Sequence, residues 1–252
     1  MESTAALDAF ELADSTTWSN DLLESDVEHV VGRIRSCSLA GGPFDHLIVP
    51  DFLPADLFAG VGAALADMPT GFQRSSAVLT AYQVPVRHLT PATRRLRAVL
   101  TDHLVAQTVL DTFAHVLAPL MDDGRHPGGW PAITPQRIFP RVELMRDTEA
   151  MVLPPHTDSH GRLVAALVYF PVSGGGADLG TRFYRPLDPA LSCDGRRCHD
   201  FSQFEEAGRA PYAANSLCLF ARTDTSFHGL PALARGSDRR AVQWSLLRNG
   251  HF

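Results

Sequence analysis

The sequence predicts an α+β fold, with helices in the first half of the chain and short strands in the second half. Before residue 120, several segments repeat apolar residues every three to four positions, which is typical of amphipathic helices. From residue 136, short runs rich in β-branched and aromatic residues alternate with Gly, Pro, Asp and Ser, which is typical of strands joined by turns. The chain has 252 residues, 45% of them hydrophobic, and this length suits one large strand-rich domain.

Charge and composition exclude several classes of protein. The net charge is −6 and no segment is dense in lysine or arginine, so the sequence predicts no nucleic-acid-binding surface. The amino terminus lacks the basic region and apolar core of a secretory signal, and no run of 18 or more apolar residues predicts a membrane span. The four cysteines are irregularly spaced, which suits a reducing compartment. We therefore expect a cytoplasmic protein without membrane or nucleic-acid partners.

The first half of the chain predicts helices interrupted by short strands. Residues 21–34 form an amphipathic pattern, and residues 46–49 predict a short strand. A second helix is expected from Pro54 to about Met68, because proline is favoured in the first turn of a helix. Residues 72–88 alternate irregularly and predict one or two strands. A long helix is expected from residue 91 to about residue 117, ending near the following proline.

The second half of the chain predicts a sheet-rich core. Residues 163–170 are apolar on both faces, which indicates a strand that is covered on both sides. Residues 185–210 are less apolar and predict a loop of the kind that often covers an active site. The expected strands comprise residues 137–145, 150–153, 162–170, 177–184, 216–221, 225–227 and 239–247.

A histidine and a carboxylate two residues apart, in Pro154-Pro155-His156-Thr157-Asp158-Ser159, define the candidate site. On a strand, residues i and i+2 point to the same face, so His156 and Asp158 could bind one metal ion. Such a pair is common by chance, and a surface turn is the alternative interpretation of it alone. A second histidine would complete the two-histidine, one-carboxylate set that holds non-haem Fe(II) and leaves positions open. His228 is the best candidate for that ligand.

The order of these motifs resembles the Fe(II)/2-oxoglutarate-dependent oxygenases, in particular their prolyl-4-hydroxylase-like branch. The resemblance extends over residues 136–248: the His-x-Asp pair, a Gly-rich loop, a strand region ending at His228, and a strand opening with Arg239 and Arg240. It implies a double-stranded β-helix core, also called jelly-roll or cupin-like, over residues 136–252. It further implies that a mainly helical region, residues 1–135, braces this core within a single domain.

The resemblance also implies an arginine that binds the distal carboxylate of 2-oxoglutarate shortly after the last histidine. Arginine suits this role because its guanidinium group can bind a carboxylate with two parallel hydrogen bonds. Arg239 shares a strand face with Gln243 and Ser245, whereas Arg240 shares a face with apolar residues. We therefore favour Arg239, with Arg240 as the alternative.

Two further residues are weaker candidates for cosubstrate binding. Tyr169 lies on the predicted strand after the His-x-Asp pair, where the related enzymes place a hydroxyl group on the cosubstrate. Arg146 lies upstream of His156, where prolyl hydroxylases often have a tyrosine, so Arg146 is a candidate contact for either cosubstrate or substrate. A purely structural role is the alternative for Arg146. His160 is not expected to be a ligand, because the chain turns at this point in the motif of the related enzymes.

The resemblance implies a dioxygenase that uses Fe(II), 2-oxoglutarate and O2, with ascorbate as a reductant. Such an enzyme hydroxylates an unactivated C–H bond and releases succinate and CO2. Because Asp158 is retained, hydroxylation, desaturation or cyclisation is favoured over halogenation. We expect a small-molecule substrate, such as an amino acid or a natural-product intermediate. The alternatives are a hydroxylase of peptide or protein residues with the same site, and a non-catalytic β-helix protein that binds a metal or ligand. The sequence leaves the oligomeric state open.

Overall fold

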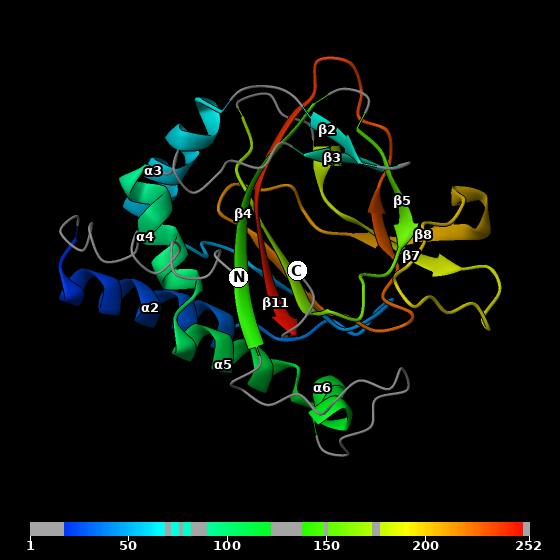
Figure 1. The fold of residues 1–252 in the computed structure, drawn as a ribbon, viewed down its shortest axis with the longest axis horizontal. Coiled ribbons are helices and arrows are strands. Elements are labelled where there is room, and N and C mark those ends of the chain that lie inside the picture. The colour runs from blue at the N-terminus through cyan, green and yellow to red at the C-terminus, as the bar shows by residue number, and fades with distance from the viewer. Residues whose placement is uncertain are drawn as a thin grey trace, which may run out of the picture.

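Antiparallel strands form two larger sheets and a separate hairpin (Figure 1). The computed structural model describes residues 18–68, 72–75, 78–81, 90–121, 138–148, 151–172 and 177–248. The first sheet has the strand order β1 (His46–Val49), β9 (Leu217–Ala221), β6 (Arg162–Tyr169), β11 (Asp238–Arg248) and β4 (Ile138–Thr148). The second has the order β5 (Leu153–His156), β10 (His228–Leu230), β7 (Arg182–Pro186) and β8 (Phe204–Arg209). The hairpin pairs β2 (Phe72–Ser75) with β3 (Val78–Ala81).

The two larger sheets share a buried apolar cluster, so they pack face to face. Tyr169 on β6 and Phe220 on β9 belong to the same cluster as Phe183 on β7 and Leu230 on β10. Successive residues of a strand point to opposite faces. The five-stranded sheet therefore directs one set of side chains toward the four-stranded sheet and the other set away from it.

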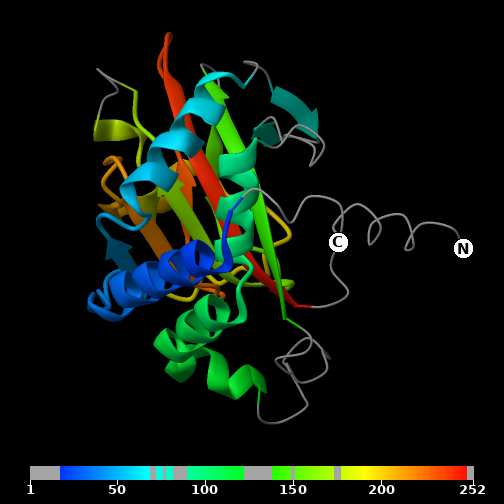
Figure 2. The same ribbon diagram turned by 90° about the vertical axis from the view of Figure 1, so that its left-hand side faces the viewer.

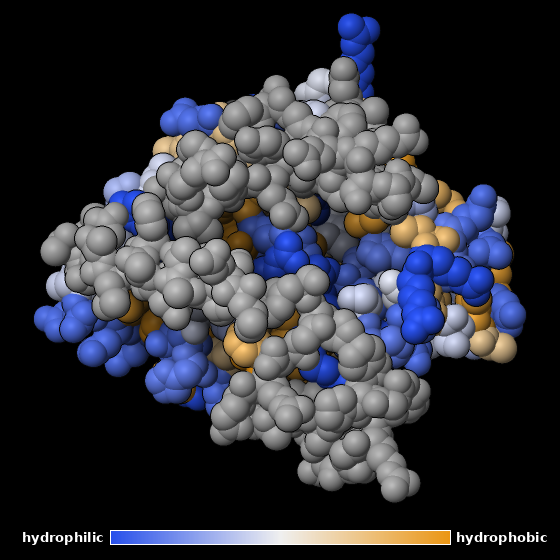
Figure 3. Space-filling model, viewed as in Figure 1, coloured by the Kyte–Doolittle hydropathy of each residue, from blue (hydrophilic) through white to orange (hydrophobic). Residues whose placement is uncertain are grey.

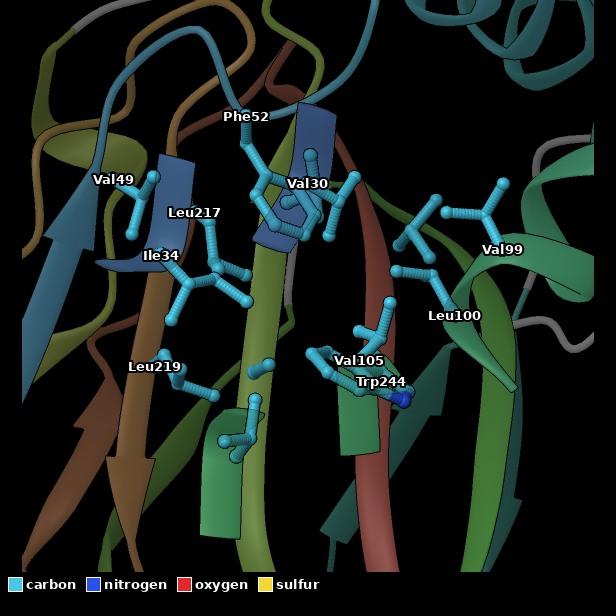
Figure 4. Packing of buried hydrophobic residues seen from close by; sticks show 14 of the residues in the cluster. Val30, Ile34, Val49, Phe52, Val99, Leu100, Val105, Leu217, Leu219 and Trp244 are labelled. Atoms are coloured by element: carbon cyan, nitrogen blue, oxygen red, sulfur yellow. The ribbon is translucent and has the colours of Figure 1, made fainter. Parts of the chain in front are cut away.

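Helices cover the outer face of the five-stranded sheet (Figure 2). Figure 4 shows Val30 and Ile34 from the first helix close to Leu217 and Leu219 from β9, with Trp244 from β11 beside Val105. Because these side chains are buried in one cluster, burial of apolar surface holds the helices on the sheet. The helices are α2 (Asn20–Arg35), α3 (Ala55–Ala66), α4 (Pro91–Leu100), α5 (His103–Thr112) and α6 (Ala114–Met121).

The prediction of one long helix from residue 91 to about residue 117 is wrong, because this segment forms three helices, α4, α5 and α6. The side chain of Asp102 accepts a hydrogen bond from the backbone N–H of Leu104 and caps the start of α5. A second break lies at Phe113, and α6 continues past the proline at which an end was expected. The apolar spacing continues across both breaks, so periodicity alone does not reveal them.

Most of the predicted strands are present, with shifted bounds. The strand at residues 46–49 and the first helix agree with the prediction, apart from one residue at each end of the helix. Residues 177–179 form a short 3-10 helix rather than the start of a strand. The strand expected at residues 225–227 lies instead at His228–Leu230, as β10. The predicted loop over residues 185–210 contains β8. Among the described strands, β8 lies at a sheet edge and pairs with β7 alone, so its sequence need not be apolar.

Within the described ranges, none of the helices combines the length and the apolar character that crossing a lipid bilayer requires.

Candidate metal centre

His156, Asp158 and His228 come together in the four-stranded sheet. His156 is the last residue of β5 and His228 is the first residue of β10, and the two are directly opposite partners in the ladder. Their ring centroids are 4.4 Å apart. One potential ligand atom from each of the three residues lies within 4.8 Å of the other two, a distance set that one metal ion can bridge. His156 and Asp158 do meet at one point, but they do not share a strand as the sequence pattern predicts. β5 ends at His156, and Asp158 follows in the turn.

Backbone contacts orient both imidazoles toward this common point. Nδ1 of His156 lies 3.0 Å from the carbonyl oxygen of Pro154, and Nδ1 of His228 lies 3.0 Å from that of Ser226. A carbonyl oxygen can only accept a hydrogen bond, so Nδ1 carries the proton in each ring and Nε2 presents a lone pair. Burial and the neighbouring His156 lower the pKa of His228 to about 4, which keeps this imidazole neutral near pH 7.

The carboxylate of Asp158 has one paired and one unpaired oxygen. Oδ1 accepts a hydrogen bond of 2.5 Å from Nη1 of Arg162, whereas the buried Oδ2 has no hydrogen-bond partner within the described part of the chain. Oδ2 lies 3.7 Å from Nε2 of His228. Burial acts to raise the pKa of Asp158, but Arg162 and the two neighbouring imidazoles together outweigh burial, so the pKa is lowered. An ionised, buried and unpaired oxygen beside two imidazole lone pairs fits a divalent cation well.

The three residues line a cavity between the two sheets. The cavity has a volume of about 80 Å³. On the same measure one water molecule needs about 10–15 Å³, so the cavity has room for several waters or a small ligand. Its other polar walls are formed by Asp147, Arg162, Thr181, Arg239 and Gln243, and its apolar walls include Met145, Met151, Leu153, Leu167, Phe220 and Leu230. Figure 3 shows hydrophilic residues near the centre of this face of the molecule. The cavity therefore combines a candidate metal centre with apolar walls and a few charged groups.

Arg239 lies in this cavity and is almost fully buried, with 4% of its surface exposed. Its Nε donates to the carbonyl oxygen of Leu179 at 2.7 Å, and its Nη1 donates to Oδ2 of Asp147 at 2.6 Å. Its guanidinium carbon lies 5.7 Å from the ring centroid of Tyr169. Burial acts to lower the pKa of Arg239, but the carboxylate of Asp147 outweighs this effect and the pKa is raised. Arg239 is therefore a fixed cation in the same cavity as the candidate metal ligands.

Comparison with solved structures identifies this architecture. No protein-family model matches the chain, and no curated protein matches it. The chain is similar to the non-heme alpha ketoglutarate dependent epimerase SnoN from nogalamycin biosynthesis (16% identity, TM-score 0.50, 88% of this chain and 83% of that one). It is also similar to a prolyl 4-hydroxylase from Phytophthora capsici (14% identity, TM-score 0.53, 88% of this chain and 65% of that one). A prolyl 4-hydroxylase from Pseudomonas putida is similar as well (14% identity, TM-score 0.50, 89% of this chain and 100% of that one).

The chain has the fold of the 2-oxoglutarate/Fe(II) oxygenases. These neighbours have a jelly-roll core, and the two facing antiparallel sheets described above correspond to it. At identities of 14–16%, the likeness extends to the fold, and the chemistry of the site has to be argued from the residues present.

In this oxygenase fold, Arg240 and Arg146 lie away from the cavity lining. Both pair with Asp238: Nη2 of Arg240 at 2.6 Å, and Nε and Nη2 of Arg146 at 2.9 Å each. Nη1 of Arg146 also donates to the carbonyl oxygens of Ala66 and Met68 at the end of α3. These contacts give Arg146 a structural role that joins β4, β11 and α3.

Tyr169 lies beside Arg239 and is fully buried. Its hydroxyl group is 2.8 Å from Oγ1 of Thr181 and accepts a hydrogen bond from the Thr181 backbone N–H at 3.2 Å. Burial raises the pKa of Tyr169, so the phenol stays protonated near neutral pH. Thr181, rather than Tyr169, is the member of this pair that lines the cavity.

Sequence reasoning assigned no site role to four polar residues that line the cavity, Asp147, Arg162, Thr181 and Gln243. With its amide oriented to suit its neighbours, Oε1 of Gln243 accepts from Nη1 and Nη2 of Arg162 at 3.0 and 2.9 Å. Gln243 shares strand parity with Arg239, which is a signal that the sequence does carry. Asp147 is the direct ladder partner of Arg239, and this pairing between β4 and β11 becomes visible only once the strand register is known.

Proposed function

We propose that the protein is an Fe(II)- and 2-oxoglutarate-dependent dioxygenase that hydroxylates an unactivated C–H bond. The observation that carries the proposal is the convergence of one ligand atom each from His156, Asp158 and His228, with the unpaired Oδ2 of Asp158 3.7 Å from Nε2 of His228. Two histidines and one carboxylate on one side of an ion are typical of non-haem Fe(II) oxygenases, because the remaining positions stay open. A buried cation, Arg239, shares the cavity with these ligands.

The residues of the cavity would divide the work between metal binding, cosubstrate binding and exclusion of water. His156, Asp158 and His228 would hold the iron, and Arg239 would bind the distal carboxylate of 2-oxoglutarate. Bound iron, together with O2 and 2-oxoglutarate, supplies the oxidising chemistry that releases succinate and CO2. The apolar walls would position one C–H bond of the substrate and keep bulk water away from the metal.

The substrate is proposed to be a small molecule, such as an amino acid or a natural-product intermediate. The support is the modest size of the cavity and its mostly apolar lining, and one structural neighbour is an epimerase from nogalamycin biosynthesis. Prolyl 4-hydroxylases share the fold equally well, and they favour the second candidate, a hydroxylase of peptidyl residues. Succinate release with free amino acids and small natural products, compared with release with prolyl peptides, separates the two.

The proposal is tested by succinate formation from 2-oxoglutarate in the presence of Fe(II), O2 and ascorbate. Asp158→Ala should abolish turnover and Fe(II) binding. Arg239→Ala should raise the KM for 2-oxoglutarate by about 10- to 100-fold, the value of a charge-assisted hydrogen bond of about 1.5–3 kcal/mol. Arg240→Ala is the matched control and should leave this KM unchanged, because Arg240 pairs with Asp238 outside the cavity lining. If the wild-type protein neither binds 2-oxoglutarate nor consumes it, a non-catalytic binding protein is the better interpretation.

A further inference from the structure

A buried carboxylate lies beside the arginine that is proposed to bind the cosubstrate. Asp147 is only 2% exposed and lines the cavity together with Arg239. Its Oδ2 accepts the 2.6 Å hydrogen bond from Nη1 of Arg239, whereas its buried Oδ1 has no hydrogen-bond partner within the described ranges. The pair is held in place by the backbone, because Asp147 and Arg239 are opposite residues of the β4–β11 ladder.

The charges of this pair make it an unusual receptor for a dicarboxylate. Asp147 and Arg239 together are neutral, so the cation is already compensated before a ligand arrives. A ligand carboxylate bound at Arg239 would leave two negative charges and one positive charge in a buried place. Uncompensated buried charge is strongly unfavourable, and it would oppose binding unless one of the carboxylates is neutralised.

We propose that Asp147 takes up one proton from solvent when a dicarboxylate such as 2-oxoglutarate binds at Arg239. The proton adds to the Asp147 carboxylate, and the ion pair with Arg239 is exchanged for one between Arg239 and the ligand. The total charge of the buried group then stays at zero. The protonated Asp147 becomes a hydrogen-bond donor that can face the ligand carboxylate. This inference rests on the proposed function, since it requires a dicarboxylate in the cavity.

Among the ionisable groups around the ion pair of Asp147 and Arg239, Asp147 is the group that can accept the proton. Within the part of the chain that the structure describes, Arg239 on β11 is the charged group that faces Asp147, and Nε of the same guanidinium group donates to the carbonyl oxygen of Leu179. Tyr169 on β6, Tyr212 and Cys218 on β9 also face Arg239, and burial raises the pKa of both phenols and of the thiol, so all three stay neutral near pH 7. Burial likewise raises the pKa of Asp147, against the opposing effect of Arg239, which makes protonation less costly here than at the surface.

The experiment is calorimetric titration of the Mn²⁺-loaded protein with 2-oxoglutarate, in buffers of different ionisation enthalpy, between pH 6.5 and pH 8.5. Free carboxylates titrate at about pH 3–5, so the ligand itself takes up no proton in this range. We expect uptake of about one proton per bound ligand. By linkage, the affinity should then fall by up to about tenfold for each unit of rising pH.

Asp147→Asn tests the assignment of the proton. Asparagine cannot take up the proton and adds no negative charge, so proton uptake and the pH dependence should both disappear. At pH 8.5 this variant should bind 2-oxoglutarate more tightly than the wild type does, whereas a merely structural role for Asp147 predicts weaker binding. Asp238→Asn is the matched control, because Asp238 pairs with Arg240 on the same strand, and it should keep the proton uptake.

The possible results are distinct, and the first comparison does not depend on the folding of any variant. Binding without proton uptake in the wild type would overturn the inference and leave the proposed function intact. Uptake that persists in Asp147→Asn would assign the proton to another group and also overturn the inference. Absence of 2-oxoglutarate binding in the wild-type protein would overturn the proposed function, and the inference with it.

Discussion

Asp158 has two carboxylate oxygens in different surroundings, and this difference decides how it can bind a metal. Arg162 occupies Oδ1 through a hydrogen bond of 2.5 Å, so Oδ2 is the oxygen left for an ion. Gln243 in turn contacts both terminal nitrogens of Arg162. Loss of a group that holds a metal-binding carboxylate in one orientation typically lowers metal affinity by about ten- to a hundredfold.

Replacement of Arg162 should therefore weaken metal binding without removing a ligand. In Arg162→Gln, Asp158 loses its fixed orientation and its compensating charge, and we expect the dissociation constant for Mn²⁺ to rise by about tenfold or more. The measurement is a Mn²⁺ titration followed by electron paramagnetic resonance. Arg240→Gln is the control: it removes an arginine from the face of β11 opposite to Gln243 and should leave the Mn²⁺ affinity unchanged. Equal affinities for wild type and Arg162→Gln would show that the contact does not orient Asp158.

Some residues of the site could be found in the sequence, and others could not, for a physical reason. His156, Asp158, His228 and Arg239 occur in a recognisable order, and strand parity separates Arg239 from Arg240. Asp147 carries no such signal, because its importance comes from direct pairing with Arg239 across the β4–β11 ladder. Register between strands that are far apart in sequence depends on tertiary packing, which local patterns do not specify.

At the scale of elements, the segment between β7 and β8 packs on the turn that carries Asp158. The carbonyl oxygen of Cys193 accepts a hydrogen bond from Oγ1 of Thr157 at 2.8 Å, and the backbone N–H of His199 donates to Pro155 at 2.8 Å. A Cβ atom at Gly195 would clash with the backbone of Asp158, and Gly195 has a positive φ of 79°. The close approach of the two segments thus requires glycine at this position.

Gly195→Ala should disturb the metal-binding turn, and Gly236→Ala provides a matched control. Both glycines have φ of 79°, but a Cβ at Gly236 meets no atom within 4 Å. Both variants carry the backbone cost of a left-handed alanine, about 1 kcal/mol or somewhat more. Gly195→Ala should in addition weaken Mn²⁺ binding, measured in the same titration, because the clash moves Asp158. If both variants bind Mn²⁺ as the wild type does, the segment between β7 and β8 does not support the site.

The element scale also shows where sequence patterns stop being sufficient. β8 was predicted as loop because its residues, Phe-Glu-Glu-Ala-Gly-Arg, are mostly polar or small, yet its backbone pairs with β7 at the edge of the sheet. The break between α4 and α5 has a local cause at Asp102, whose capping side chain is visible in the sequence. In that case a signal was present, and the continuous apolar spacing concealed it.

At the scale of the whole molecule, the helices and the five-stranded sheet share one core, and Trp244 lies within it. Trp244 is 1% exposed and is among the largest fully buried side chains. Trp244→Ala should lower the free energy of unfolding by about 3–5 kcal/mol, the usual cost of removing a large aromatic side chain from a core. Chemical denaturation followed by circular dichroism measures it. Leu187→Ala is the control, because Leu187 is 63% exposed, and it should change stability by less than about 0.5 kcal/mol.

Metal binding should also stabilise the whole molecule, because the ligands are brought together only in the folded chain. His156 and His228 are 72 positions apart in the sequence (228 − 156 = 72), so an unfolded chain offers no comparable site. At a free metal concentration of 100 times Kd, stabilisation by mass action is about 2.7 kcal/mol. For a domain of this size that corresponds to a rise in Tm of about 5–10 °C, at about 2–4 °C per kcal/mol.

Thermal unfolding with Mn²⁺ and with a chelator tests this prediction, and carboxylate variants show which site is responsible. Asp158→Ala removes a ligand and should unfold at the same temperature with and without Mn²⁺. Asp194→Ala removes a half-exposed carboxylate of the segment between β7 and β8, which pairs with Arg196, and should keep the full rise in Tm. If Asp158→Ala keeps the rise as well, the stabilising ion binds elsewhere, and the convergence of two imidazoles and one carboxylate does not form a metal centre.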